Sequence, residues 1–107
     1  MSSVPVQRVT LFKIPSLEDQ ARFIDIYRTI PTQAKKNGKP YIISASVGPT
    51  FDDVRNQGYT LAVHAVFASV EDMKYYDDEC AAHGEVKKVA KTLHKEGSMT
   101  AYFQSAI

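Results

Sequence analysis

The chain has 107 residues, of which 44% are hydrophobic and 23% charged, and its formal net charge at pH 7 is +1. That length predicts one small domain over residues 1–107, with a core at about 7–105, and the balanced charge excludes the strong positive field that gathers nucleic acid or anionic membranes. A single cysteine, Cys80, excludes an intrachain disulfide, and no cysteine and histidine set has the spacing of a metal site. We therefore expect no structural metal and a reducing compartment.

Neither a secretory signal nor a membrane span is indicated by the sequence. The N-terminal residues lack the basic start and apolar stretch of a signal peptide, and the longest apolar runs fall well short of the roughly 18 residues that a membrane span needs. We expect a cytoplasmic protein with no membrane partner.

The first predicted strand covers residues 7–14, where Val9 and Leu11 alternate with Thr10, Phe12 and Ile14. This alternation has the period of two that is typical of a strand with two different faces.

A helix is predicted to begin near Leu17, because Ser16 is a favourable N-cap and two acidic residues follow it. Pro31 should kink this helix or restart a short turn that runs to Lys36, since proline removes a backbone donor. The expected buried stripe recurs at three and four residues and comprises Leu17, Ala21, Ile24 and Tyr27, flanked by Phe23, Ile26 and Ile30.

Two more strands are predicted in the middle of the chain. A compact turn at 37–40 precedes a strand over 41–47, and the aperiodic segment 48–58 is long enough to be a candidate functional loop. The next strand, residues 59–67, alternates without a strongly polar face. Both faces of the sheet are therefore expected to be covered.

The last third of the chain predicts two helices and a strand. Ser69 caps a helix that runs from residue 70 to about 76, and a second helix begins at the acidic residues 77–79 and ends at Gly97. Residues 99–104 alternate as a final strand.

The order βαββαβ, with the last helix split, predicts a ferredoxin-like α+β fold. Right-handed crossovers place the helices on one face of a four-stranded sheet. The other face would then expose an apolar patch larger than most monomers tolerate. We therefore expect a homodimer that packs sheet against sheet.

Several sequence strings resemble the stress-responsive A/B barrel (Dabb) family. They are Arg8–Lys13, the Gly58–Thr60 entry to a strand that ends at Ser69, and Tyr76 placed seven residues before His83. The resemblance covers roughly residues 7–105 and implies a dimeric α/β barrel made of two ferredoxin-like subunits, in agreement with the dimer expected from the apolar sheet face.

The resemblance also implies a catalytic pair. In catalytic members of the family, a histidine near the start of the last helix and a tyrosine shortly before it form an acid/base pair. His83 matches the place of the histidine, which would be the base, and Tyr76 that of the tyrosine, which would be the acid. An imidazole can remove a proton next to a carbonyl group, and a phenol can donate to the oxygen. Tyr75 competes with Tyr76, and His83 has the alternative role of a packing residue that orders segment 77–82. Arg8 stands where the family often has a histidine.

Five further residues are candidates for binding a small molecule. An apolar cavity between sheet and helices is expected to be lined by Phe12, Phe23 and Tyr27, although core packing explains them equally well. Arg8 shares a strand face with Thr10 and would suit an acidic ligand group at the mouth, or would pair with a neighbouring acid.

The remaining polar residues predict no other site. His64 is expected to have a structural role in mid-strand at a dimer interface, and His94 to be solvated. Acidic neighbours make Cys80 an improbable nucleophile. The basic cluster 35–39 is too short and too poor in aromatic residues to predict nucleic-acid binding.

Three functions follow as hypotheses. The first is a cofactor-independent acid/base enzyme, an aldol-type cyclase, aldolase or lyase, that acts on a small apolar carbonyl or polyketide-like compound. The second is a non-catalytic, stress-associated dimer that binds ligands or self-assembles. The third is a dimeric-barrel monooxygenase or haem-binding protein, for which the sequence offers no clear ligand pair.

Overall fold

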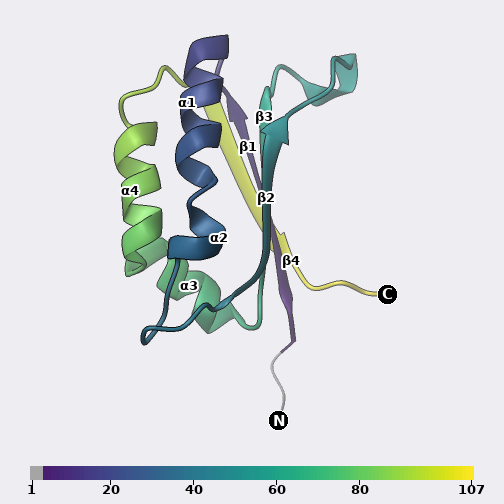
Figure 1. The fold of residues 1–107 in the computed structure, drawn as a ribbon. Coiled ribbons are helices and arrows are strands. Elements are labelled where there is room, and N and C mark those ends of the chain that lie inside the picture. The colour runs from purple at the N-terminus through teal and green to yellow at the C-terminus, as the bar shows by residue number, and fades with distance from the viewer. Residues whose placement is uncertain (1–3) are drawn as a thin grey trace.

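The computed structural model describes residues 4–107 and has the predicted ferredoxin-like topology. All neighbouring strands are antiparallel, in the order β2-β3-β1-β4, and the helices lie on one side of the sheet (Figure 1). The elements are β1 (Val6–Lys13), α1 (Leu17–Tyr27), α2 (Ile30–Gln33), β2 (Ile42–Pro49), a short 3-10 helix (Val54–Asn56), β3 (Leu61–Phe67), α3 (Val70–Asp78), α4 (Ala81–Ala90) and β4 (Gly97–Phe103).

The two central strands, β1 and β3, divide their side chains between two faces as predicted. β3 alternates strictly between buried and half-buried residues. The register pairs Arg8 with Ala65 and Thr10 with both Val63 and Thr100, so these side chains share the face that the helices cover.

The predicted buried stripe of α1 is confirmed at Tyr27 and at the flanking Phe23 and Ile30, and it is wrong at the start of the helix. Leu17 is 80% exposed and Ala21 is also exposed, whereas the buried positions are Gln20, Phe23 and Tyr27. The cause is a polar contact that hydrophobicity does not register: the buried Gln20 side chain donates a hydrogen bond of 2.8 Å to the carbonyl oxygen of Ile14. That bond turns Gln20 inward and leaves Leu17 in solvent.

The segment after α1 restarts as predicted, but it is shorter. α2 has Pro31 in its first turn and ends at Gln33 rather than Lys36. The expected turn is present, with positive φ angles at Asn37 and Gly38. Segment 48–58, expected to be a functional loop, begins with the end of β2 and contributes no residue to the cavity described below.

Both boundaries of the predicted last helix are wrong. Residues 77 and 78 belong to the end of α3, and α4 begins at Ala81 with Cys80 as its N-cap residue. α4 ends at Ala90, seven residues before Gly97, because the backbone N–H of Glu96 donates to the carbonyl oxygen of Lys13 at 2.8 Å. The chain must leave the helix early to reach that sheet partner.

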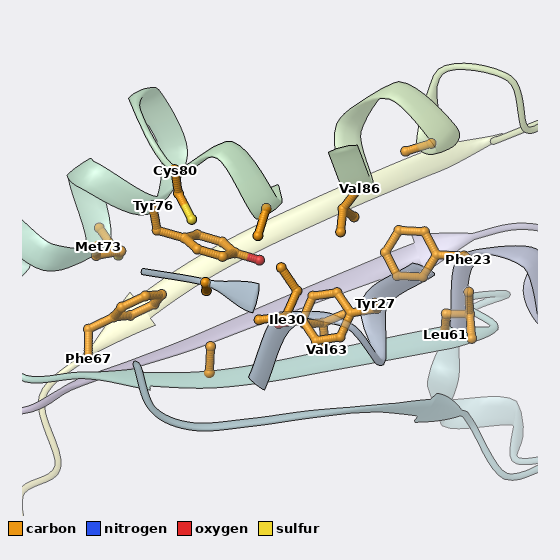
Figure 2. Packing of buried hydrophobic residues seen from close by; sticks show 14 of the residues in the cluster. Phe23, Tyr27, Ile30, Leu61, Val63, Phe67, Met73, Tyr76, Cys80 and Val86 are labelled. Carbon is orange, nitrogen blue, oxygen red and sulfur yellow. The ribbon is translucent and has the colours of Figure 1, made fainter. Parts of the chain in front are cut away.

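The hydrophobic core fills the layer between the sheet and the helices. Figure 2 shows aromatic residues of α1 and α3 and aliphatic residues of α4 packed over β3. No helix of residues 4–107 covers the opposite face, so the expectation that both faces are covered is not met within one chain. That open face carries Val9, Leu11, Ala62, His64, Val66, Met99, Ala101 and Phe103. None of the helices in this range is long and apolar enough to cross a membrane.

Candidate functional site

A cavity of about 160 Å³ lies between the helix-covered face of the sheet and the helices. Figure 2 shows Phe23 and Tyr27 from α1, Tyr76 from α3 and Val86 from α4 around the same interior region. All seven residues proposed as catalytic or binding candidates line it, together with six others. The lining comprises Arg8, Thr10, Phe12, Phe23, Tyr27, Val63, Ala65, Tyr76, His83, Val86, Lys87, Ala90 and Lys95.

His83 is held in one orientation by the end of the preceding helix. Its Nδ1 lies 2.8 Å from the carbonyl oxygen of Tyr76, and because a carbonyl only accepts, Nδ1 must carry the proton and donate. Nε2 is then unprotonated in the neutral ring. Nε2 has no hydrogen-bond partner among residues 4–107, while the His83 side chain is only 12% exposed. The arrangement therefore presents one free basic nitrogen at the cavity wall.

The local environment keeps the imidazole of His83 neutral. Burial lowers the pKa of His83 from 6.5 to about 4, the bond to the Tyr76 carbonyl partly opposes this shift, and the positive charges of Lys87 and Arg8 add to it. The ring also lies flat on the Tyr76 ring, with centroids 3.6 Å apart and planes inclined by 11°. At neutral pH the histidine is therefore in the form that can accept a proton.

The two tyrosines of the cavity keep their phenolic protons. Burial raises the pKa of Tyr76, and the neighbouring Tyr27 hydroxyl raises it further. Burial also raises the pKa of Tyr27. Tyr27 is 3% exposed, and its hydroxyl lies near that of Tyr76, which lowers the Tyr27 pKa, but the two hydroxyls do not meet hydrogen-bond geometry. A ligand oxygen that accepts from Tyr27 would give this buried hydroxyl a well-formed hydrogen bond.

Arg8 forms an ion pair with an acidic residue, which was one of the two roles predicted for it from the sequence. Its Nη1 lies 2.6 Å from Oδ1 of Asp77, and its guanidinium carbon lies 5.4 Å from the centroid of the Tyr76 ring. The ion pair ties β1 to the end of α3 and offsets the positive charge of Arg8 beside the cavity. Thr10 is likewise engaged, since its hydroxyl lies 3.2 Å from that of Thr100.

The structure distinguishes between the two competing tyrosines by position. The Tyr75 hydroxyl donates to the carbonyl oxygen of Lys35 at 3.1 Å, and Tyr75 does not line the cavity. Tyr76 does, and it also contacts His83. Tyr76 is therefore the tyrosine that a ligand in this cavity would meet.

Sequence reasoning missed six lining residues for different reasons. Val63, Ala65, Val86 and Ala90 are apolar and recur at the spacing of their strand or helix, so periodicity could have placed them in the interior. Lys87 and Lys95 fall within the predicted last helix, where charged residues are expected to point to solvent. No sequence signal indicates that these two long side chains reach the cavity mouth.

The other singled-out residues lie away from the cavity. His64 is on the open sheet face, where its Nε2 lies 2.9 Å from Oε1 of Gln7. His94 is 70% exposed beside Glu96, as expected for a solvated residue. Cys80 is buried at the start of α4. In the basic cluster, Lys36 pairs with Asp72 at 2.7 Å.

The same fold occurs in solved structures, several of which are of dimeric proteins. A dimeric ferredoxin-like protein of unknown function from Bacteroides fragilis superposes with a TM-score of 0.76 at 17% identity, over 98% of this chain and all of that one. Hydroxynitrile lyase from Passiflora edulis also gives a TM-score of 0.76 at 17% identity, over 95% and 94% of the two chains. These likenesses define the class, a ferredoxin-like α+β domain whose neighbours are dimeric.

Sequence comparison then identifies the family. The sequence model of the stress responsive A/B barrel domain (Dabb) matches residues 6–100, so the chain belongs to this family. A curated relative from Gibberella zeae (strain PH-1), named Fusaristatin A biosynthesis cluster protein, is 50% identical over 99 residues, which are 92% of this chain and 72% of the relative. The resemblance predicted from the sequence is confirmed.

Proposed function

We propose that this protein is a cofactor-independent acid/base enzyme that acts on a small, largely apolar carbonyl compound in a reaction of the aldol, cyclisation or lyase kind. The observation that carries the proposal is the tautomer of His83. Its Nδ1 is committed to the Tyr76 carbonyl, which leaves Nε2 free to accept a proton at the wall of an apolar cavity.

The proposed reaction uses the tyrosines as hydrogen-bond donors. When Nε2 removes a proton from the carbon next to a carbonyl group, negative charge develops on the carbonyl oxygen. Tyr76 and Tyr27 stay protonated because burial raises the pKa of both, so either hydroxyl can donate to that oxygen. Protonated His83 can then return its proton to the product. Phe12 and Phe23 would hold the apolar body of the substrate.

A biosynthetic role is supported by the half-identical relative. Its name assigns that protein to a biosynthesis cluster, which supports a role in small-molecule synthesis for this chain too.

We further propose that the chain works in the cytoplasm as a single domain and forms a homodimer through the open sheet face. The dimeric structural neighbours support the homodimer.

Hydrogen exchange at carbon tests the proposal without knowledge of the substrate. Small ketones such as phenylacetone exchange the protons next to the carbonyl with deuterium oxide, and NMR measures the rate. We expect the wild-type protein to accelerate this exchange, His83→Gln to remove about 100-fold or more of the acceleration, and Tyr76→Phe to remove about tenfold. The matched control is His94→Gln, which removes an exposed histidine outside the cavity.

Two results would overturn the enzyme proposal. One is that, for every small ketone tested, the exchange rate with the wild-type protein equals the rate in buffer alone. The other is full activity in His83→Gln, which would assign the exchange to other groups.

A second function, a non-catalytic dimer that binds a ligand or self-assembles, is favoured by a different feature of the same residue. The His83–Tyr76 contact spans the break between α3 and α4, so the histidine also fixes this junction. Loss of stability in His83→Gln, together with no exchange activity in the wild type, would support this function.

The haem hypothesis does not fit the cavity. Sites for drug-sized ligands occupy about 300–1,000 Å³, whereas this cavity has about 160 Å³. We therefore do not propose haem binding. The other half of that hypothesis, a dimeric-barrel monooxygenase, remains a prediction from the sequence.

A further inference from the structure

The mouth of the cavity carries positive charge that no lining residue neutralises. Lys87 and Lys95 both line the cavity and are exposed at their positions, whereas the 13 lining residues include no aspartate or glutamate. The third cation, Arg8, already pairs with Asp77 at 2.6 Å. Asp77 lies beside this lining, and its carboxylate is engaged by Arg8 and lies 4.0 Å from Nδ1 of His83.

The two lysines keep donors available for a ligand. The Lys87 ammonium donates one hydrogen bond to the backbone carbonyl of Asp77, and an ammonium group has three donors. Nζ of Lys95 lies 5.9 Å from the centroid of the Phe12 ring, at the edge of the apolar lining, and forms no ion pair among the described residues. Lys88, by contrast, pairs with Glu85.

The size of the cavity limits what can enter it. About 150 Å³ of apolar space is known to hold one benzene molecule in an engineered protein cavity. The present cavity, about 160 Å³, therefore has room for one ring or a short chain between Phe12, Phe23 and Val86. Any further polar group of such a ligand must lie at the mouth, where the two lysines are.

We propose that the ligand is a small carboxylic acid whose ring or short chain fills the cavity and whose carboxylate binds Lys87 and Lys95 at the mouth. The proposal rests on the proposed function, because it names the substrate class for the site of His83. It predicts that only one end of a longer polyketide-like acid enters the cavity. A neutral carbonyl compound of the same size would fill the cavity in the same way but would have no carboxylate to bind the two lysines.

The test compares two ligands that differ in charge. Phenylacetate and phenylacetamide have the same ring and nearly the same shape, and protein NMR titration gives the affinity of each. We expect the acid to bind the wild type about tenfold more tightly than the amide, because hydrogen bonds between charged groups are the stronger ones. In the double variant Lys87→Met/Lys95→Met the two affinities should become equal.

Two controls locate the effect. Lys91→Met removes a positive charge from the same end of α4 without touching the cavity lining, and it should keep the tenfold preference. The methyl signals of Val63 and Val86 should shift with both ligands, because these residues line the cavity. Raising the salt concentration to about 0.5 M should weaken only the acid, since salt screens charges at an exposed mouth.

Four results would overturn this inference. Three of them are equal binding of acid and amide by the wild type, an unchanged preference in the double lysine variant, and binding of neither ligand at millimolar concentration. The first two leave the proposed acid/base function intact, because that function is decided separately by deuterium exchange with neutral ketones. Shifts confined to residues outside the cavity would also overturn it.

Discussion

The imidazole of His83 lies flat on the ring of Tyr76, at 3.6 Å between centroids, and the same histidine donates a hydrogen bond to the Tyr76 backbone carbonyl. One residue of α4 thus contacts both the side chain and the main chain of one residue of α3. The contact links the two helices at their junction and at the same time fixes which ring nitrogen is left without a proton. Stability and the proposed chemistry therefore depend on the same pair, and different substitutions should separate them.

Replacing Tyr76 tests how much the ring contributes without its hydroxyl. The side chain is 3% exposed and also packs against Phe67 at 5.2 Å between centroids. Tyr76→Ala should lower the free energy of unfolding by about 3–5 kcal/mol, whereas Tyr76→Phe should change it by about 1 kcal/mol or less. Urea denaturation measures both. Equal losses in the two variants would contradict the view that the ring, rather than the hydroxyl, stabilises the junction.

The lowered pKa of His83 makes stability depend on pH in a defined window. With a pKa of about 4 in the folded protein and 6.5 in the unfolded chain, protons bind the unfolded chain first as the pH falls. The free energy of unfolding should therefore decrease between about pH 6.5 and 4, by about 3 kcal/mol, and this contribution should stay constant below pH 4.

Comparison with His83→Gln isolates that contribution from those of the carboxylates. Urea denaturation at several pH values should give a steeper decrease for the wild type than for His83→Gln between pH 6.5 and 4. Parallel curves in this range would show that His83 is not held neutral by the fold. His94→Gln, which changes an exposed histidine, should follow the wild type.

Patterns of alternation predicted the strands and their order well, because hydrophobic periodicity reports which face of a strand is buried. In β3 the predicted alternation is observed, and its buried face supplies Val63 and Ala65 to the cavity. The same signal failed at the start of α1, where Gln20 is buried and bonded to Ile14 while Leu17 and Ala21 are exposed. Polarity alone does not reveal that a glutamine has a buried backbone partner.

The catalytic pair of the candidate site was predicted from the family resemblance, and the geometry around it was not predicted. The sequence placed His83 and Tyr76 near each other, but the early end of α4 and the resulting position of Lys95 depend on the sheet contact of Glu96. Such a contact joins residues 83 positions apart, at Lys13 and Glu96, and has no local signature. Hydrophobic periodicity could therefore not predict that the cavity mouth is positively charged.

The ion pair of Arg8 and Asp77 should contribute more to stability than an exposed pair of the same charges. The Arg8 side chain is 14% exposed, whereas both partners of the Arg28–Asp25 pair are 72% exposed. We expect Asp77→Asn to lower the free energy of unfolding by about 1–2 kcal/mol and Asp25→Asn by less than about 0.5 kcal/mol. Urea denaturation of both variants provides the comparison, and equal effects would mean that partial burial of Arg8 does not strengthen its pair.

The open sheet face should hold two chains together. In one chain it leaves Met99 50% and Phe103 52% exposed beside the half-buried side chains of β1. We expect the wild type to sediment at micromolar concentration with twice the 11.9 kDa mass of the chain. Met99→Asp should shift it to the monomer, because a carboxylate would be buried at the interface without a partner. Leu17→Asp, on the exposed side of α1, should remain dimeric. A wild-type protein that sediments as a monomer would contradict the prediction that this face is a dimer interface.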